Sequence, residues 1–246
     1  MKSLTFNLCI FSSLIGFLPA ASINISFAGD RTGNLGVQIF ADDVAGVVPG
    51  SSWNRATGKS GEMELITTDG QFGGNLLWDA SNTWGGNGAD NADERLMNGW
   101  LDDTGFGAGL FISGIPFVRY DIYIYGGADG GNGLKGYTMS VNGTEYFSKG
   151  AFVNLSDDST FFDGSNYVNG LEDLPNPSYF KYPDVTGDLM SLGGARNTNG
   201  PLLPTGSRDY RGTVAGIQIV EIVPEVSTNG LLMCSLLGFA AVRRRA

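Results

Sequence analysis

The segment at residues 118–125 constrains the fold more than any other stretch of this chain. Its residues alternate so regularly that successive side chains would point to opposite faces of an extended backbone. One face would carry Val118, Tyr120, Ile122 and Ile124, and the other Arg119, Asp121, Tyr123 and Tyr125. This period of two predicts a β-strand with one face in a core.

Further strands are predicted on both sides of this segment. Asn142-Gly143 separates two short strand candidates, residues 137–141 and 144–147, and this dipeptide favours the two-residue turn of a β-hairpin. Residues 23–27, expected to form a half-buried strand, and residues 214–222 are short, strongly apolar strands near the ends of the domain. We expect these two strands to pair and to bring the ends of the domain together.

The alternation is lost in two long regions. Residues 71–103 and 154–210 are rich in Gly, Asn, Asp or Pro, and we expect long loops there, with short strands in the second region only at Phe161-Phe162 and Tyr179-Phe180. One exception is residues 93–98, where two acidic residues at the start favour a turn or two of helix. With 38 glycines and no amphipathic helix, the chain predicts an all-β fold, an antiparallel β-sandwich of jelly-roll type with long loops, over residues 22–222. The strand pattern and the Gly-Ile-Gln-Ile ending resemble jelly-roll, galactose-binding-like modules.

The N-terminal residues have the pattern of a secretory signal peptide. Lys2 precedes a mostly apolar stretch at residues 4–18, and Pro19-Ala20-Ala21-Ser22 supplies a small-residue cleavage site. We therefore expect residues 1–21 to form a signal helix that directs export through the inner membrane.

The C-terminal residues 223–246 have the pattern of a second targeting signal. A polar stretch with Pro224-Glu225 precedes an apolar run at residues 231–242, and Arg243, Arg244 and Arg245 follow. A dozen residues make a helix of about 18 Å, which is shorter than the roughly 20 residues of a stable membrane span. The arginines would stay on the cytoplasmic side, so the tail predicts a temporary membrane stop. The alternative is a buried C-terminal helix of a soluble domain.

This order of motif, apolar run and arginine cluster resembles the PEP-CTERM sorting signal of Gram-negative bacteria. The resemblance implies that an exosortase, a membrane transpeptidase-like enzyme, reads the tail in an organism that secretes extracellular polysaccharide. It further implies transient inner-membrane association and a final location at the cell surface or outside the cell. Val226 stands where the family motif has its second proline, and this departure should loosen the extended backbone at Glu225.

Charge and composition exclude several classes of function for residues 22–222. This region holds 11 basic and 24 acidic residues, a net charge of 11 − 24 = −13, which would repel nucleic acid. The chain has no histidine. Its two cysteines, Cys9 and Cys234, lie in the N-terminal signal peptide and in the C-terminal signal, outside the domain. Ser-His and Cys-His nucleophile systems and the common zinc sites are therefore excluded from the domain.

Carboxylates remain available for ion binding or catalysis. Two oxygen-rich segments would suit a structural calcium ion: residues 87–94, and Asp157-Asp158 with Asp163. Neither has the ligand spacing of a helix-loop-helix calcium site. Solvated acidic loops are the alternative. The pairs Asp42-Asp43, Asp102-Asp103 and Asp157-Asp158 keep open a carboxylate- and ion-dependent enzyme acting on glycans.

The sequence favours a non-catalytic surface or matrix protein that binds extracellular polysaccharide over that enzyme. The candidate contacts are Tyr123 and Tyr125, whose two-residue spacing aims both rings the same way, with Arg119 and Asp121 beside them and Trp84 in a glycine-rich segment. The alternative is that the other sheet or a loop covers these rings.

Overall fold

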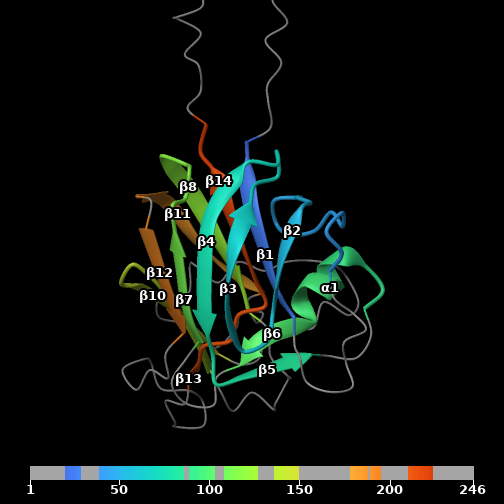
Figure 1. The fold of residues 1–246 in the computed structure, drawn as a ribbon. Coiled ribbons are helices and arrows are strands. Elements are labelled where there is room, and N and C mark those ends of the chain that lie inside the picture. The colour runs from blue at the N-terminus through green and yellow to red at the C-terminus, as the bar shows by residue number, and fades with distance from the viewer. Residues whose placement is uncertain are drawn as a thin grey trace, which may run out of the picture.

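The computed structural model describes residues 20–28, 39–85, 89–102, 108–126, 136–149, 178–187, 189–194 and 210–223 (Figure 1). These residues form mainly antiparallel β-sheets and one short helix, which confirms the all-β prediction. The expected signal helix and C-terminal helix lie outside the described residues. Within the described part of the chain, no helix is long and apolar enough to cross a membrane.

One sheet has five strands in the order β11-β8-β14-β1-β2. Its members are β11 (Tyr179–Thr186), β8 (Arg119–Tyr125), β14 (Gly216–Glu221), β1 (Ser22–Ala28) and β2 (Trp53–Thr57). The first and last strands pair antiparallel, with Ile23 opposite Ile219 and Ile25 opposite Ile217. The prediction that the ends of the domain come together is therefore confirmed. Only the β1–β2 pair within this sheet is parallel.

The second sheet has seven strands, six of them in the order β10-β9-β12-β7-β4-β3. Its members are β10 (Thr144–Lys149), β9 (Gly136–Val141), β12 (Leu189–Gly194), β7 (Ala108–Ser113), β4 (Phe72–Asp79), β3 (Ser60–Ile66) and β13 (Tyr210–Arg211), which pairs with β9. The predicted hairpin is confirmed: Asn142 and Gly143 turn the chain with positive φ values of 46° and 84°, and Val141 lies opposite Thr144.

Both regions expected to be long loops contain strands. Residues 71–103 hold β4, β5 (Asn82–Gly85) and β6 (Gly99–Asp102), and residues 154–210 hold β11 and β12. The loop prediction is wrong for β4 because Gly73-Gly74 interrupts its alternation. The short strand expected at Tyr179-Phe180 is confirmed as the start of β11, which continues past Pro183 because it is an edge strand with a break in register between Tyr182 and Val185, where the missing N–H is tolerated. The short strand expected at Phe161-Phe162 lies outside the described residues.

The main core lies between the two large sheets and is built from both of them. Ile23, Ile122 and Ile217 come from the five-stranded sheet, and Leu76 and Ile112 from the seven-stranded sheet. Across this core Phe27 and Trp78 meet edge to face, with ring centroids 6.5 Å apart. Alternation in each strand therefore selects the side chains that fill the space between the sheets.

A second cluster covers the opposite face of the five-stranded sheet. We call its outer layer the cap: residues 39–50, β5, β6 and the helix α1 (Ala92–Met97). Leu96 of α1 packs against Gly216 of β14, where an added β-carbon would lie 2.7 Å from Leu96 Cδ1. Because the cap and the core enclose β1 from both sides, even Asn24 and Ser26 are buried. The expectation of a half-buried first strand is therefore wrong.

The helix itself agrees with the sequence prediction. Asn91 is its N-cap and accepts a hydrogen bond from Glu94 N over 2.9 Å, while the Glu94 carboxylate reaches back to Asp90 N. This reciprocal arrangement satisfies backbone donors that the first turn of a helix leaves free.

Candidate functional site

Tyr123 and Tyr125 do share one face of β8, but that face is covered. Tyr123 is 8% exposed and Tyr125 is fully buried, because both belong to the cluster beneath the cap. The Tyr179 ring of β11 packs against both of them, with its centroid 5.9 and 6.1 Å from the two ring centroids. The expected open pair of rings for a sugar chain is therefore wrong, and the covered arrangement is the correct alternative.

Tyr125 instead fixes the cap to the sheet through its hydroxyl group. This hydroxyl donates to Gln218 Oε1 and accepts from Val47 N over 2.8 Å. The Gln218 amide nitrogen then donates to Asn24 Oδ1 over 3.0 Å and to Val48 O over 2.8 Å. Burial raises the pKa of Tyr125 above its usual range, so the hydroxyl keeps its proton and its role is structural.

Arg119 and Asp121 belong to β8 as well, and their side chains pair with residues of the neighbouring edge strand β11. Arg119 Nε is 2.7 Å from Asp184 Oδ1, and Lys181 Nζ is 2.7 Å from Asp121 Oδ2. Hydrogen bonding to Asp184 raises the pKa of the Arg119 guanidinium. Lys181 also lies 5.3 Å from the Tyr123 ring centroid. These charged side chains connect β8 to β11. They do not lie beside an exposed pair of tyrosine rings, contrary to the sequence prediction.

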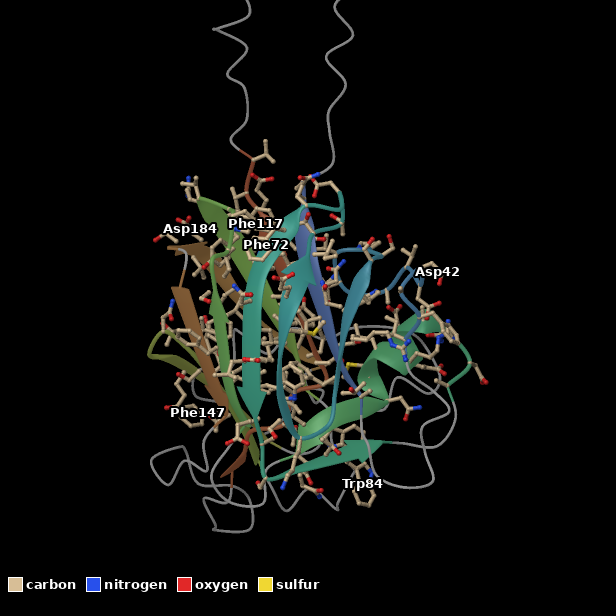
Figure 2. The ribbon with its side chains drawn as sticks, viewed as in Figure 1. Asp42, Phe72, Trp84, Phe117, Phe147 and Asp184 are labelled. Atoms are coloured by element: carbon tan, nitrogen blue, oxygen red, sulfur yellow. The ribbon has the colours of Figure 1, made fainter. Side chains whose placement is uncertain are left out.

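The other predicted residues fall into separate places. Trp84 lies in β5 opposite Trp100 of β6 and is half-buried against the cap cluster. Figure 2 shows it at the end of the molecule where β5 and β6 lie. The sorting residues Pro224, Glu225, Arg243, Arg244 and Arg245 lie outside the described residues, as do Asp157, Asp158 and Asp163.

The described acidic side chains of the cap have structural partners. Asp93 Oδ1 accepts from Gly46 N over 2.8 Å, and burial raises the pKa of Asp93. Asp43 receives two hydrogen bonds from Arg95, of 2.7 and 2.8 Å, and this contact lowers the pKa of Asp43. Across the described ranges, no three His, Cys, Asp or Glu side chains gather closely enough to hold a metal ion. The calcium segment at residues 87–94 is described only from residue 89 onward.

The structure does display a different apolar surface, on the outer face of the seven-stranded sheet. We call it the open sheet face: Ile66 of β3, Phe72 and Leu77 of β4, and Phe111 of β7. Phe72 and Leu77 are each 53% exposed and Phe111 is 39% exposed. Register places Ile66 opposite Phe72 and Leu77 opposite Phe111, so the four side chains form two cross-strand pairs on one face, separated by the polar row of Glu64, Asn75 and Ser113.

A bulge in β4 is what puts both of its apolar residues on this face. Phe72 and Leu77 are an odd number of positions apart, and a regular strand would send them to opposite sides. Gly74 has φ +110°, and a β-carbon there would lie 2.5 Å from Ser113 O. Only glycine fits this position, and the bulge restores Phe72 to the outer face.

Polar groups border the apolar pairs. Asn75 lies opposite Ser113 on one side and Glu64 on the other, while Glu62 lies opposite Leu77. Sequence reasoning missed this face because it assigned residues 71–103 to loops. The alternating pattern of residues 75–79 and 108–113 is the signal that could have found it.

Comparison with family models, with curated proteins and with solved structures finds no match for this chain. The arguments for function therefore come from the geometry of the molecule and from its sequence.

Proposed function

We propose that this chain is an exported, non-catalytic protein of the cell surface or extracellular matrix that binds extracellular polysaccharide through the open sheet face. The exposure of Phe111, Leu77 and Phe72 on the outer face of one sheet is the observation that carries the proposal. Apolar patches of this kind on soluble domains commonly mark binding surfaces. We interpret the two large sheets around their shared core as a jelly-roll-like β-sandwich that supports this face.

The chemistry of the face suits a sugar polymer. Phenyl and leucine side chains can contact the apolar C–H surfaces of sugar rings, while the Asn75 amide, the Ser113 hydroxyl and the flanking carboxylates can bond to sugar hydroxyl groups. The net charge of −13 between residues 22 and 222 opposes a polyanion. A neutral polysaccharide is therefore the favoured ligand. The engagement of Asp43, Asp93 and Asp121 in structural contacts supports binding rather than catalysis.

We also propose that the C-terminal residues deliver the protein to its location. Pro224 and Glu225 would be read by an exosortase-type enzyme, and Arg243, Arg244 and Arg245 would hold the apolar run in the inner membrane until processing. The geometry supports a tail that can reach a membrane, because the domain ends at Val223 in an exposed position rather than inside a core.

Affinity electrophoresis in gels containing the host's own extracellular polysaccharide tests the binding proposal. Phe111→Ser should weaken binding by about 1 to 3 kcal/mol, roughly 5- to 150-fold. Phe40→Ser is the matched control, since Phe40 is an exposed phenyl ring in the cap and should leave retardation unchanged. Equal retardation of the wild type and both variants would contradict the assignment of this face.

Deletion of residues 231–246 tests the sorting proposal. The shortened chain should appear in the soluble fraction after export, whereas the full chain should sediment with membranes before processing. Unchanged sedimentation of the shortened chain would show that the tail is not what holds the protein.

A further inference from the structure

The two ends of the described domain leave it side by side. Glu221 N donates to Ala21 O over 2.9 Å, and Ile222 N donates to Arg119 O over 2.9 Å. The β3–β4 turn joins the same end, because Thr68 N donates to Ser22 O over 2.8 Å. We call this end of the molecule the exit pole: Ala21, residues 66–72, residues 114–119 and residues 220–223. Figure 1 shows the start of β1 and the end of β14 together there.

Exposed apolar side chains gather around the exit pole. Of the eight large apolar side chains exposed in the described part of the chain, four belong to it: Ile66, Phe72, Val118 and Val223. Val118 is 83% exposed, the highest value among them. Figure 2 labels Phe72 at this end, and Phe72 Cε1 would lie 3.8 Å from a β-carbon placed on Gly114.

The segment that presents Val118 is firmly held. Ile115 and Phe117 are buried in the main core, while Pro116 and Val118 point outward in alternation with them. The exposure of Val118 therefore does not come from a loosely packed loop. The apolar surface to be explained is the group that Val118 forms with Ile66, Phe72 and Val223 at the exit pole.

Two ion pairs of β8 lie beside the segment that carries Val118, and the exit pole also holds the carboxylates Asp69 and Glu221. Arg119 pairs with Asp184 over 2.7 Å, and Lys181 pairs with Asp121 over 2.7 Å. A domain with net charge −13 would be repelled by anionic lipid. Ion pairs beside Val118 reduce the repulsion between the exit pole and anionic lipid.

The tail limits how far this pole can be from a membrane. Val223 is the last described residue and the apolar run begins at Leu231, so 231 − 223 = 8 residue steps separate them. A fully extended chain covers at most about 29 Å over eight steps. While the apolar run is in the membrane, Val223 and the exit pole around it therefore stay within about 29 Å of the point where the run enters the lipid.

We propose that the exit pole docks on the lipid surface of the membrane that holds the tail, with Val118 and Val223 inserted at the headgroup boundary and Ile66 and Phe72 at the rim. Apolar groups at such a boundary lie roughly 5–10 Å deep. Docking would fix the orientation of the domain, with the exit pole facing the membrane and the Pro224-Glu225 motif at the membrane surface. The inference rests on the proposed role of the tail.

The test places a fluorescent label on the full chain in vesicles. Cys9 and Cys234 are replaced by Ser, and Val118→Cys carries an environment-sensitive dye. The matched control is Ser60→Cys, because Ser60 is exposed at the other end of β3, roughly 20 Å from Ile66 along the strand. The vesicles contain phosphatidylethanolamine, a minority of phosphatidylglycerol and a spin-labelled lipid that quenches the dye at short range.

Strong quenching at position 118 with little at position 60, persisting in high salt, would support docking through apolar contact. Equal, weak quenching at both positions in chains that resist alkaline carbonate extraction would overturn docking and leave the proposed tail intact. Quenching that high salt abolishes would overturn the apolar mechanism. Release of the chain by carbonate would overturn the role of the tail and the docking with it. If the dye at position 118 moves to an apolar environment in host membranes but not in the lipid vesicles, the surface binds a protein partner and the lipid proposal is wrong.

Discussion

The buried hydroxyl group of Tyr125 gives the sharpest prediction about how this fold is held together. Tyr125→Phe removes one oxygen atom and leaves the ring, so it creates no cavity. The change leaves Gln218 Oε1 without its hydrogen bond from Tyr125 and Val47 N without an acceptor. Both groups belong to the contact between the cap and the five-stranded sheet, and the substitution therefore weakens that contact specifically.

The expected loss follows from the burial of the two orphaned groups. Gln218 is fully buried, and an unsatisfied buried polar group costs about 1–3 kcal/mol. Val47 is half-buried, so water can partly replace its partner and its contribution is near the lower end of that range. The sum is about 2–4 kcal/mol of unfolding free energy, or a lowering of the urea midpoint by about 1–2 M.

Urea unfolding followed by tryptophan fluorescence measures this loss, and Tyr120→Phe is the matched control. Tyr120 is equally buried, but its hydroxyl donates to the carbonyl of Gly187, which is exposed and can bind water instead. The control should lose about 1 kcal/mol or less. Equal losses for the two variants would refute the reasoning that the cap depends on Tyr125.

The same residue predicts the response of the protein to alkali. Burial raises the pKa of Tyr125 in the folded state, whereas an unfolded tyrosine ionises near pH 10. The resulting stability is complete below about pH 10 and is lost as the pH rises further, because only the unfolded state releases the proton. In Tyr125→Phe the decline above about pH 10 should be shallower than in the wild type. An unchanged slope would contradict a raised pKa.

Two further substitutions test the cap and the bulge. Arg95→Met removes both hydrogen bonds to Asp43 and should lower stability at neutral pH by about 1 kcal/mol. Because the contact lowers the pKa of Asp43, the difference from the wild type should shrink as the pH falls below about 4, and urea midpoints at both pH values will show this. Gly74→Ala should lower the melting temperature more than Gly70→Ala, since both glycines have positive φ but only Gly74 faces Ser113 O. Similar losses would contradict the bulge geometry.

Local sequence patterns were sufficient for several elements of this fold. The period of two in β8, the Asn142-Gly143 turn and the short helix that follows Asn91 all depend on residues within a few positions of one another. Backbone geometry and turn preferences depend on residues close together in the chain, so these elements can be predicted from one sequence. The pairing of β1 with β14 followed from their shared apolar character.

Local patterns failed where a tertiary contact compensates for an unfavourable residue. Gly73-Gly74 looks like a loop until Ser113 and its neighbours in β7 complete the ladder around the bulge. Pro183 looks incompatible with a strand until β11 is found at the edge of its sheet. Alternation in residues 75–79 and 108–113 could have indicated two strands, but the open sheet face also requires β4 and β7 to lie side by side, which only the tertiary structure shows.

The sequence alone determined which side chains of β8 share a face, since a pleated backbone sends alternate residues to opposite sides. It did not determine what covers them. The cap that buries Tyr125 includes Val47, 78 positions away, and the amide that binds its hydroxyl belongs to Gln218, 93 positions away. Whether a ring on a strand meets water or another segment depends on how distant parts of the chain pack, and only the tertiary structure decided that for Tyr123 and Tyr125.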